Sequence, residues 1–499
     1  MTGTARASAS QPFGRVMRAI DKLSQHTAPT GAYRLALQAV FLRRMWESAA
    51  LPAAGTGSAS QGPSREPHWA VLADEAADNA ERGRPGIRTT EHALEDVWRR
   101  AGTARFLDLG PRDAVETPRL SGQADRLLTD LIGTVAAADR IDDMFGACLD
   151  RYSRKLGSGG NYYTPRSISR LMAGVAAPRP GERVLDPACG SAGLLVEAAR
   201  FARSQAAGPG ELELHGRDID AEVREVAAMN LVLNSLDGDL AMGPVDSLRT
   251  GVTGLGCDVV LANLPFNMAD WGHDDLRNDS RWIYGTPPAG QANFAWVQHI
   301  ISELSIRGRA VVLLADGVAK GARVGERKIR QRLVEEDVIA GIVSLPAGLF
   351  PHTRISACLW LLSQDKGAHP AWGRIPRHDQ VLFIDARRSR QRTDRVPGQL
   401  SDEEADRICR TVYAWRGDDT VGDADAFADE PGWCRSVHRA EIADTGYDLT
   451  PARYMRTGSA RGTQPVTERS GCPPREELYW CFAEAARLDR QLRSVLEET

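Results

Sequence analysis

The chain has 499 residues and a mass of 54.3 kDa, more than one ordinary hydrophobic core accommodates, so we expect two or three domains. Its net charge of -4 and pI near 6.2 argue against a free-standing nucleic-acid-binding protein, because such proteins are usually basic overall. The eight cysteines are scattered without a CxxC pair, so neither a metal site nor a disulfide framework is expected. No apolar run approaches a membrane span and no apolar leader opens the chain, which predicts a cytoplasmic protein without a membrane partner.

The first 150 residues predict a helical N-terminal domain. Apolar residues recur three and four positions apart over residues 33–42 and again over 127–132. Between them, residues 51–67 are rich in Ala, Gly, Ser and Pro, which predicts a flexible loop.

From about Val184 onward, short β-branched runs alternate with helical stretches. This alternation is typical of a parallel sheet whose strands are joined by helical crossovers. We expect strands at residues 183–186, 212–216, 258–262, 310–314, 338–344, 356–362 and 381–385. The fold class is therefore α/β, with a doubly wound, mostly parallel, seven-stranded sheet in a domain over residues 151–385.

The chain beyond residue 385 is polar and irregular in pattern. We expect an extension over residues 386–456, in which Asp402–Asp406 opens a helix, then a linker over 457–474 rich in Gly, Ser, Thr and Pro. Residues 475–499 predict an amphipathic tail helix, because Leu478, Cys481, Ala485, Leu488, Leu492 and Val495 form a heptad seam. The seam suits packing on the chain itself and on another subunit equally well.

A glycine-containing turn follows the first predicted strand. Asp186 ends that strand, and residues 187–193 lead into an apolar helix, so a ligand could approach the backbone closely. The turn alone also suits a dinucleotide site or a plain tight crossover, although its spacing is not GxGxxG. Asp218 follows the second strand, where a carboxylate can accept hydrogen bonds from both ribose hydroxyls. Upstream, we expect Thr164 and Pro165 to cap the next helix.

The tetrapeptide Asn263-Leu264-Pro265-Phe266 ends the third predicted strand. An amide oxygen and a neighbouring carbonyl could each accept one hydrogen of an exocyclic amino group, and an aromatic ring could stack on an extruded base. Such acceptors would help to localise the N6 lone pair of adenine, which is otherwise delocalised into the ring. A strand-end turn with a buried Phe is the favoured interpretation of an isolated NxPF. The glycine turn and the acidic strand end before it shift the balance towards methylation.

Taken together, residues 161–166, 186–193 and 263–266 resemble, in this order, the motifs of γ-class adenine-N6 DNA methyltransferases. The similarity is greatest to the modification (M) subunit of type I restriction-modification systems, and the stretches 281–288, 293–300, 344–350, 382–387 and 446–454 also resemble that subunit. The resemblance implies S-adenosylmethionine as methyl donor and Asn263, Leu264, Pro265 and Phe266 as catalytic residues. The implied cofactor-binding residues are Asn161, Tyr162, Tyr163, Thr164, Pro165, Arg166, Asp186, Pro187, Gly190, Ser191, Ala192, Gly193, Asp218 and Asp246.

The same resemblance implies a site-specific, adenine-specific DNA methyltransferase that works in a complex. The expected partners are DNA, a separate specificity (S) subunit, a restriction (R) subunit and a second copy of the chain. No stretch is left over for a DNA target-recognition domain, so we expect the specificity subunit to read the sequence.

Leu264 stands where the family usually has proline. It keeps the backbone carbonyl but loses the fixed φ of proline, so we expect an active site that Leu264→Pro preserves or speeds up. A catalytically silent scaffold or regulator, and a methylase of protein glutamine or of RNA, remain alternatives.

Two basic clusters could contact DNA phosphates without reading sequence. They are Lys320, Arg323, Arg327, Lys328, Arg330 and Arg332, and then Arg387, Arg388, Arg390, Arg392 and Arg395. A solvated helix or loop face is the commoner outcome for such charge runs.

Overall fold

The computed structural model describes most of residues 11–455. The described residues are 11–26, 29–50, 122–138, 142–157, 164–205, 210–252, 254–265, 268–321, 323–350, 356–369, 373–388, 400–418 and 427–455. All of them belong to one compact unit, residues 1–456, while residues 457–499 form a second unit. The predicted loop over 51–67, the linker over 457–474 and the tail helix over 475–499 lie outside the described residues.

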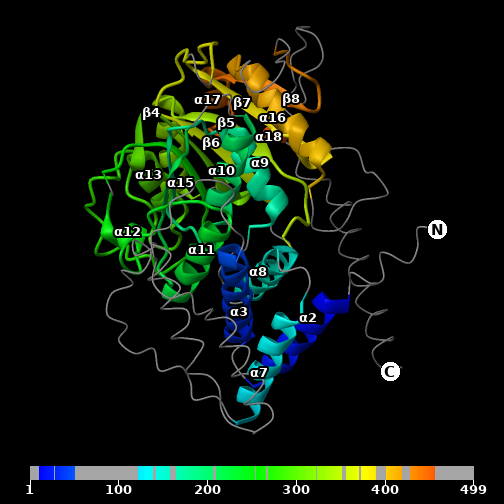
Figure 1. Ribbon diagram of the computed structural model, residues 1–499. Helices are drawn as coiled ribbons and strands as arrows, with labels where there is room; N and C mark the ends of the chain where they lie inside the picture. Colours follow the sequence, from blue (N-terminus) through cyan, green and yellow to red (C-terminus); the bar gives the residue numbers. More distant parts are fainter. Residues whose placement is uncertain are drawn as a thin grey trace, which may run out of the picture. The chain divides into compact units, whose positions relative to one another are not determined.

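The centre of the described structure is one eight-stranded sheet (Figure 1). Its strands are β1 (Arg183–Asp186), β2 (Glu213–Gly216), β3 (Cys257–Asn263), β4 (Leu304–Ala315), β5 (Ile339–Ser344), β6 (Ala357–Ser363), β7 (Gln380–Asp385) and β8 (Cys434–His438). They lie in the order β2-β1-β3-β4-β6-β5-β7-β8, and only β6 and β8 run antiparallel to their neighbours. The mostly parallel α/β sheet is confirmed.

The predicted number of seven strands is wrong, because β8 is an eighth. Its sequence, Cys-Arg-Ser-Val-His, has no β-branched run, and only Cys434 and Val437 of its five side chains are buried. The strand forms because the edge of β7 pairs with it from Gln380↔His438 to Ile384↔Cys434. Tertiary pairing overrides a weak local pattern here.

Helices cover both faces of the sheet, as successive strand residues point to opposite sides. Val184 packs in one core with α9 (Arg166–Ala176), α10 (Gly193–Gln205), α11 (Ala221–Leu233) and α16 (Asp402–Arg416). Leu185 packs in the other core, which includes residues of α12 (Ser247–Thr250), α13 (Asn293–Glu303), α14 (Gly317–Lys320), α15 (Val324–Glu335), α17 (Arg439–Asp444) and α18 (Pro451–Tyr454). The sheet is therefore doubly wound, as predicted.

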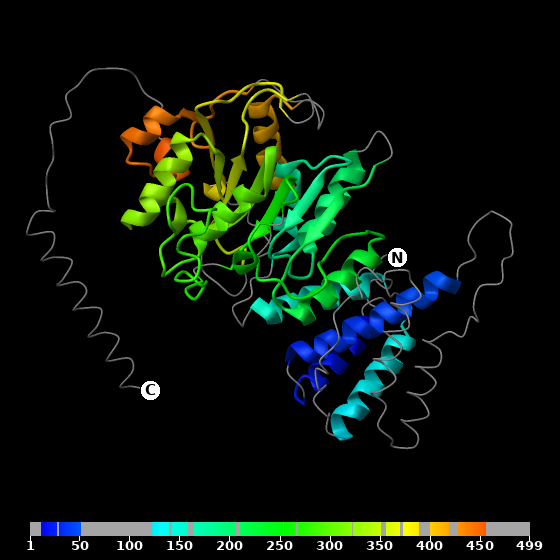
Figure 2. The same ribbon diagram turned by 90° about the vertical axis from the view of Figure 1, so that its left-hand side faces the viewer.

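Among the described residues, four further helices precede the sheet: α2 (Gln11–Leu23), α3 (Pro29–Ala50), α7 (Gly122–Ala136) and α8 (Asp142–Gly157). The two apolar stretches predicted to be helical lie in α3 and α7. Within this group α3 contacts α7 and α8, and it also lies along α11 (Figure 2). There Gln38 donates to the carboxylate of Glu225 at 2.8 Å, and Arg34 pairs with Glu225 at 3.6 Å.

The C-terminal part of the compact unit is more regular than its polar sequence suggests. Helix α16 begins as predicted, and a capping box forms between Ser401 and Glu404. The helices α17 and α18 follow β8, and the ring of Tyr454 stacks on Phe383 of β7 at 4.2 Å between centroids. This return to the sheet was not predicted. No helix among the described residues is long and apolar enough to cross a membrane.

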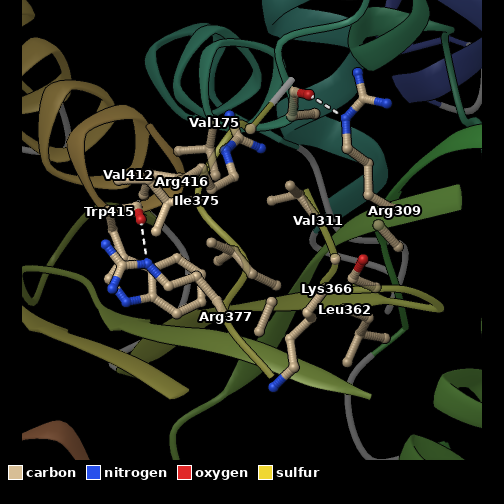
Figure 3. A pocket seen from close by; sticks show the side chains of 17 residues that line it. Val175, Arg309, Val311, Leu362, Lys366, Ile375, Arg377, Val412, Trp415 and Arg416 are labelled. Atoms are coloured by element: carbon tan, nitrogen blue, oxygen red, sulfur yellow. Dashed lines mark hydrogen bonds between the residues drawn. The ribbon is translucent and has the colours of Figure 1, made fainter. Parts of the chain in front are cut away.

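A cavity lies at the amino-terminal edge of the sheet, between α9, α16 and the strands β4 and β6 (Figure 3). Three of its cations donate to main-chain carbonyls: Arg309 donates to Ala176 at 2.6 Å, Lys366 to Gln380 at 2.7 Å, and Arg377 to Trp415 (dashed in part in Figure 3). The fourth, Arg416, pairs with Asp418. We therefore interpret this cavity as structural and look for the functional site at the opposite edge.

Candidate active site

Several of the predicted site residues that the structure describes lie where β2, β1 and β3 end. These neighbouring strands are parallel, so their carboxyl ends share one edge. Asp186 ends β1, Asp218 follows β2 by two residues, and Asn263 ends β3. The chain crosses from β1 to β2 on one side and places β3 on the other, which makes this point a reversal of strand order. Open α/β sheets bind ligands at such a point.

The turn after β1 is held by backbone hydrogen bonds. Gly190 and Ala192 have φ of 53° and 61°, a left-handed conformation that suits glycine and is uncommon for alanine. The N–H of Ala192 donates to Cys189 at 2.8 Å, and that of Cys189 donates to Arg217 at 2.8 Å. Asn230 of α11 donates to the carbonyl of Ser191 at 2.8 Å. The turn is thus built from main-chain groups before Gly193 begins α10.

Two carboxylates line this turn and accept from main-chain N–H groups. Asp186 accepts from Ala188 at 3.1 Å, and Asp218 accepts from Gly190 and Asp220, each at 2.9 Å. Neither of them forms an ion pair with another described residue. Burial raises the pKa of Asp186 to about 8; the Ala188 N–H lowers it, and the nearby Asp218 raises it further. Burial likewise raises the pKa of Asp218. A cation bound here would stabilise both ionised forms.

Asp246 lies beside the turn but serves as a helix cap. It is the N-cap of α12, and its side chain accepts from the N–H groups of Leu248 at 3.1 Å and Arg249 at 3.2 Å. The next residue, Ser247, donates its hydroxyl to the carbonyl of Pro187 at 2.6 Å. Helix α12 therefore supports the turn from the other side.

Asn263 is held by a contact that the sequence did not predict. Its Nδ2 donates to the hydroxyl of Thr164 at 2.7 Å, and the residue is only 7% exposed. The expected capping by Thr164 is wrong: Pro165 takes the N-cap position of α9, no side chain caps the helix, and the Thr164 hydroxyl turns to Asn263 instead. Arg166 points to Glu197 of α10, with its Nε 3.0 Å from a carboxylate oxygen.

The rest of the tetrapeptide is described in part. Leu264 is 1% exposed and packs in the core that contains α13 and α15, and Pro265 is half-buried. Phe266 lies outside the described residues, as do Asn161, Tyr162 and Tyr163.

A buried arginine that contacts α12 was not predicted from the sequence. Arg281, 4% exposed, donates to the carbonyls of Ser247 and Leu248 in α12 and to Nδ1 of His299 at 3.1 Å. It also pairs with Asp279 at 2.7 Å. Burial, together with the charge of Arg281, lowers the pKa of His299 to about 3, so the imidazole stays neutral and accepts this bond. The only sequence signal was that Arg281 opens a family-like stretch.

The first basic cluster divides into two kinds of residue. Arg330 is 2% exposed and donates to the carbonyls of Gly321 at 2.6 Å and Tyr447 at 3.3 Å, so its expected phosphate contact is wrong. Lys320, Arg323, Arg327, Lys328 and Arg332 are exposed. In the second cluster Arg387 is exposed, while Arg390, Arg392 and Arg395 lie outside the described residues.

The sequence matches a family model described as N-6 DNA Methylase over residues 136–462. It is 32% identical to the methylase subunit of the type I restriction enzyme HindI of Haemophilus influenzae, over 72% of this chain and 79% of that one. It is 30% identical to the methylase subunit of the type I restriction enzyme MjaIX of Methanocaldococcus jannaschii, over 63% of this chain. The match spans only 56% of that archaeal relative.

Solved structures share the fold at lower identity. The type I restriction-modification methyltransferase subunit from Streptococcus thermophilus superposes with a TM-score of 0.63 at 19% identity, covering 89% of this chain and 99% of that one. A modification subunit of a type I restriction enzyme from Vibrio vulnificus gives a TM-score of 0.58 at 18% identity, covering 88% and 96%.

Proposed function

Since this chain belongs to the N-6 DNA methylase family, we propose that it transfers a methyl group from S-adenosylmethionine to N6 of adenine in DNA. The observation that carries the proposal is the placement of Asn263 at the end of β3. It lies at the same edge of the sheet as the glycine turn and the two carboxylates, and its Nδ2 donates to the hydroxyl of Thr164.

The residues at the strand ends fit a cationic, nucleoside-bearing cofactor. Apart from Gly190 itself and its two chain neighbours, no described residue has an atom within 4 Å of the position that a Cβ at Gly190 would take, so a ligand can approach the backbone there, and Asp218 can accept from ribose hydroxyls. Asp186 and Asp218 have no cationic partner among the described residues, which suits a positively charged ligand. We assign the remaining predicted cofactor residues, from Asn161 to Arg166, Pro187 to Gly193 and Asp246, to the surroundings of the same ligand.

S-adenosylmethionine, when bound, supplies an electrophilic methyl group on a sulfonium. The N6 amino group of adenine is a weak nucleophile, because its lone pair is delocalised into the ring. The Asn263 side chain cannot rotate freely while its Nδ2 is held by Thr164, so its oxygen is the end that accepts from N6. The carbonyl of Leu264 accepts the second hydrogen, and Pro265 and Phe266 flank the base.

The methyl transfer is a single displacement, with N6 as the nucleophile and the sulfur of the donor as the leaving group. The methyl donor would supply the carbon and keep its sulfur as a neutral thioether, and N6 of the bound adenine would lose one proton to solvent. Asn263 and the Leu264 carbonyl act by orienting N6 towards the methyl group and need not take up the proton themselves.

The relatives named above are subunits of type I restriction enzymes, which supports action in a complex. We expect a specificity subunit to select the site, a restriction subunit to act on unmodified DNA, and a second copy of this chain to be present. A cytoplasmic location stays a prediction.

The test is a transfer assay with S-adenosylmethionine labelled in the methyl group. The chain is assembled with its specificity subunit and offered duplex DNA, RNA and protein in parallel. We expect label only in DNA, as N6-methyladenine. Label in RNA or protein would refute the proposal, and cofactor binding without any transfer would favour a silent scaffold.

A further inference from the structure

Exposed cations lie along the same edge of the sheet as Asn263, on the side of Asn263 that faces away from β1 and β2. Asn263 pairs with Leu313 of β4, and α14 begins at Gly317, two residues after β4 ends. The strands β5 and β7 are parallel to β4 because each of β4 and β5 is antiparallel to β6. The residues after β4 and after β7 therefore share this edge. We call the exposed side chains of Lys320, Arg323, Arg327, Lys328 and Arg387 the basic face.

Among the described residues, a carboxylate lies within ion-pair distance of only two cations of the basic face, Arg323 and Arg387. The side chains of Lys320, Arg327 and Lys328 form no hydrogen bond or ion pair with another described residue. Arg323 lies 3.6 Å from Glu326 and is 59% exposed. Arg387 is fixed by two bonds of 2.8 Å to Asp385, which leaves one end of its guanidinium for another ligand.

Charge is distributed unevenly along the edge. On the β1 and β2 side the carboxylates Asp186 and Asp218 have no ionic partner among the described residues, and the buried Arg224 donates to main-chain carbonyls. Beyond β4 the exposed Lys320, Arg327 and Lys328 have no such partner, and neither does the half-buried Asp316 directly after β4. Helix α15 carries the exposed cations Arg327 and Lys328 near its start, while at its end the exposed Arg332 lies near the exposed Glu335 and Glu336. This distribution of charge suits a site that binds a cationic cofactor on one side and a polyanion on the other.

We propose that the basic face binds the phosphates of the DNA strand next to the target adenine, with Asn263 at the boundary between the acidic and the basic half. The inference rests on the proposed function and adds where the DNA backbone lies. Cations on one side of the site contact phosphates without reading sequence, which suits a subunit whose partner reads it. They also keep the polyanion away from the carboxylates of the cofactor half.

The test compares Lys320→Gln combined with Arg327→Gln against the control Arg307→Gln. Arg307 is also exposed, but it lies in the first half of β4, at the opposite edge. Each variant is assembled with the specificity subunit. DNA affinity is measured by fluorescence anisotropy between about 50 and 200 mM salt, the range over which phosphate contacts dominate the change. Cofactor affinity is measured by titration calorimetry.

We expect the double variant to bind DNA about tenfold more weakly and to lower the slope of log K against log salt by about two, one for each lost phosphate contact. Its cofactor affinity stays at the wild-type value, which also shows that it is folded, and Arg307→Gln leaves both affinities unchanged. An unchanged salt slope in the double variant, with a wild-type complex that methylates DNA, would overturn the inference. A wild-type complex that does not methylate DNA would overturn the proposed function itself, and this inference with it.

Discussion

The cofactor end and the target-base end of the site are held in different ways. Asp186 and Asp218 accept from N–H groups only 2 and 28 residues away, within one strand-turn-helix unit and its neighbour. Asn263 depends on a hydroxyl 99 residues away, at the start of α9. The cofactor end therefore depends mainly on this local unit, with further support from Ser247 of α12. The target-base end requires α9 and β3 to be placed correctly, so changes at one end should leave the other end intact.

The largest expected effect is a loss of the methyl-transfer rate while cofactor affinity stays unchanged. We expect Asn263→Ala to lower the single-turnover methylation rate by about 10²- to 10³-fold, because an acceptor that acts in the transition state is lost. Titration calorimetry should give an unchanged dissociation constant for S-adenosylmethionine. The exposed Asn278→Ala is the matched control and should keep full activity. Substantial activity in Asn263→Ala would show that the catalytic residue is another one.

The converse is expected of Asp218→Ala. Loss of its hydrogen bonds should weaken S-adenosylmethionine binding by roughly tenfold to hundredfold, as 1.4 kcal/mol corresponds to tenfold. The rate at saturating cofactor should fall much less. Asp274→Ala, whose side chain is fully exposed, serves as control. An unchanged dissociation constant in Asp218→Ala would count against the ribose contact.

The long-range bond can be tested by itself. Thr164→Val keeps the shape but removes the acceptor, so Asn263 gains rotational freedom and the methylation rate should fall about tenfold, equivalent to one hydrogen bond. Thr164→Ser should restore the rate, which a general loss of stability would not explain. If Val and Ser behaved alike, the hydroxyl would have no positioning role.

The smallest effect concerns pH. The pKa of Asp186 is raised from 3.8 to about 8, so the folded chain keeps a proton there that the unfolded chain has lost. The contribution of Asp186 to folding stability is therefore most favourable below pH 4 and declines as pH rises towards 8. A cationic cofactor favours the ionised form, so its affinity should increase severalfold between roughly pH 6 and 8. Asp186→Asn should abolish this dependence; a flat profile in the wild type would exclude the ionic contact.

The difference between the two ends also explains what the sequence could predict. Seven strands were located because most of them are short apolar runs, several rich in β-branched residues, and the turn at Gly190 and the acidic strand end at Asp218 are local signals. The bond from Asn263 to Thr164 has no local signal, and neither does the support of α12 by Arg281. Arg330 belongs to a basic run in the sequence, yet its side chain is buried. The sequence did not predict this, because tertiary packing decides which face of α15 points inward.

Strand β8, which was not predicted from the sequence, has a consequence for assembly. The sheet ends in β8, of five residues, on one side and in β2, of four residues, on the other. Both carry charged or polar side chains at their ends, with Glu213 paired to Arg183 and Arg435 paired to Glu441. Short, charged edge strands are poor templates for another chain's strand. Partners of this subunit should therefore dock through helices and loops and leave the sheet unextended.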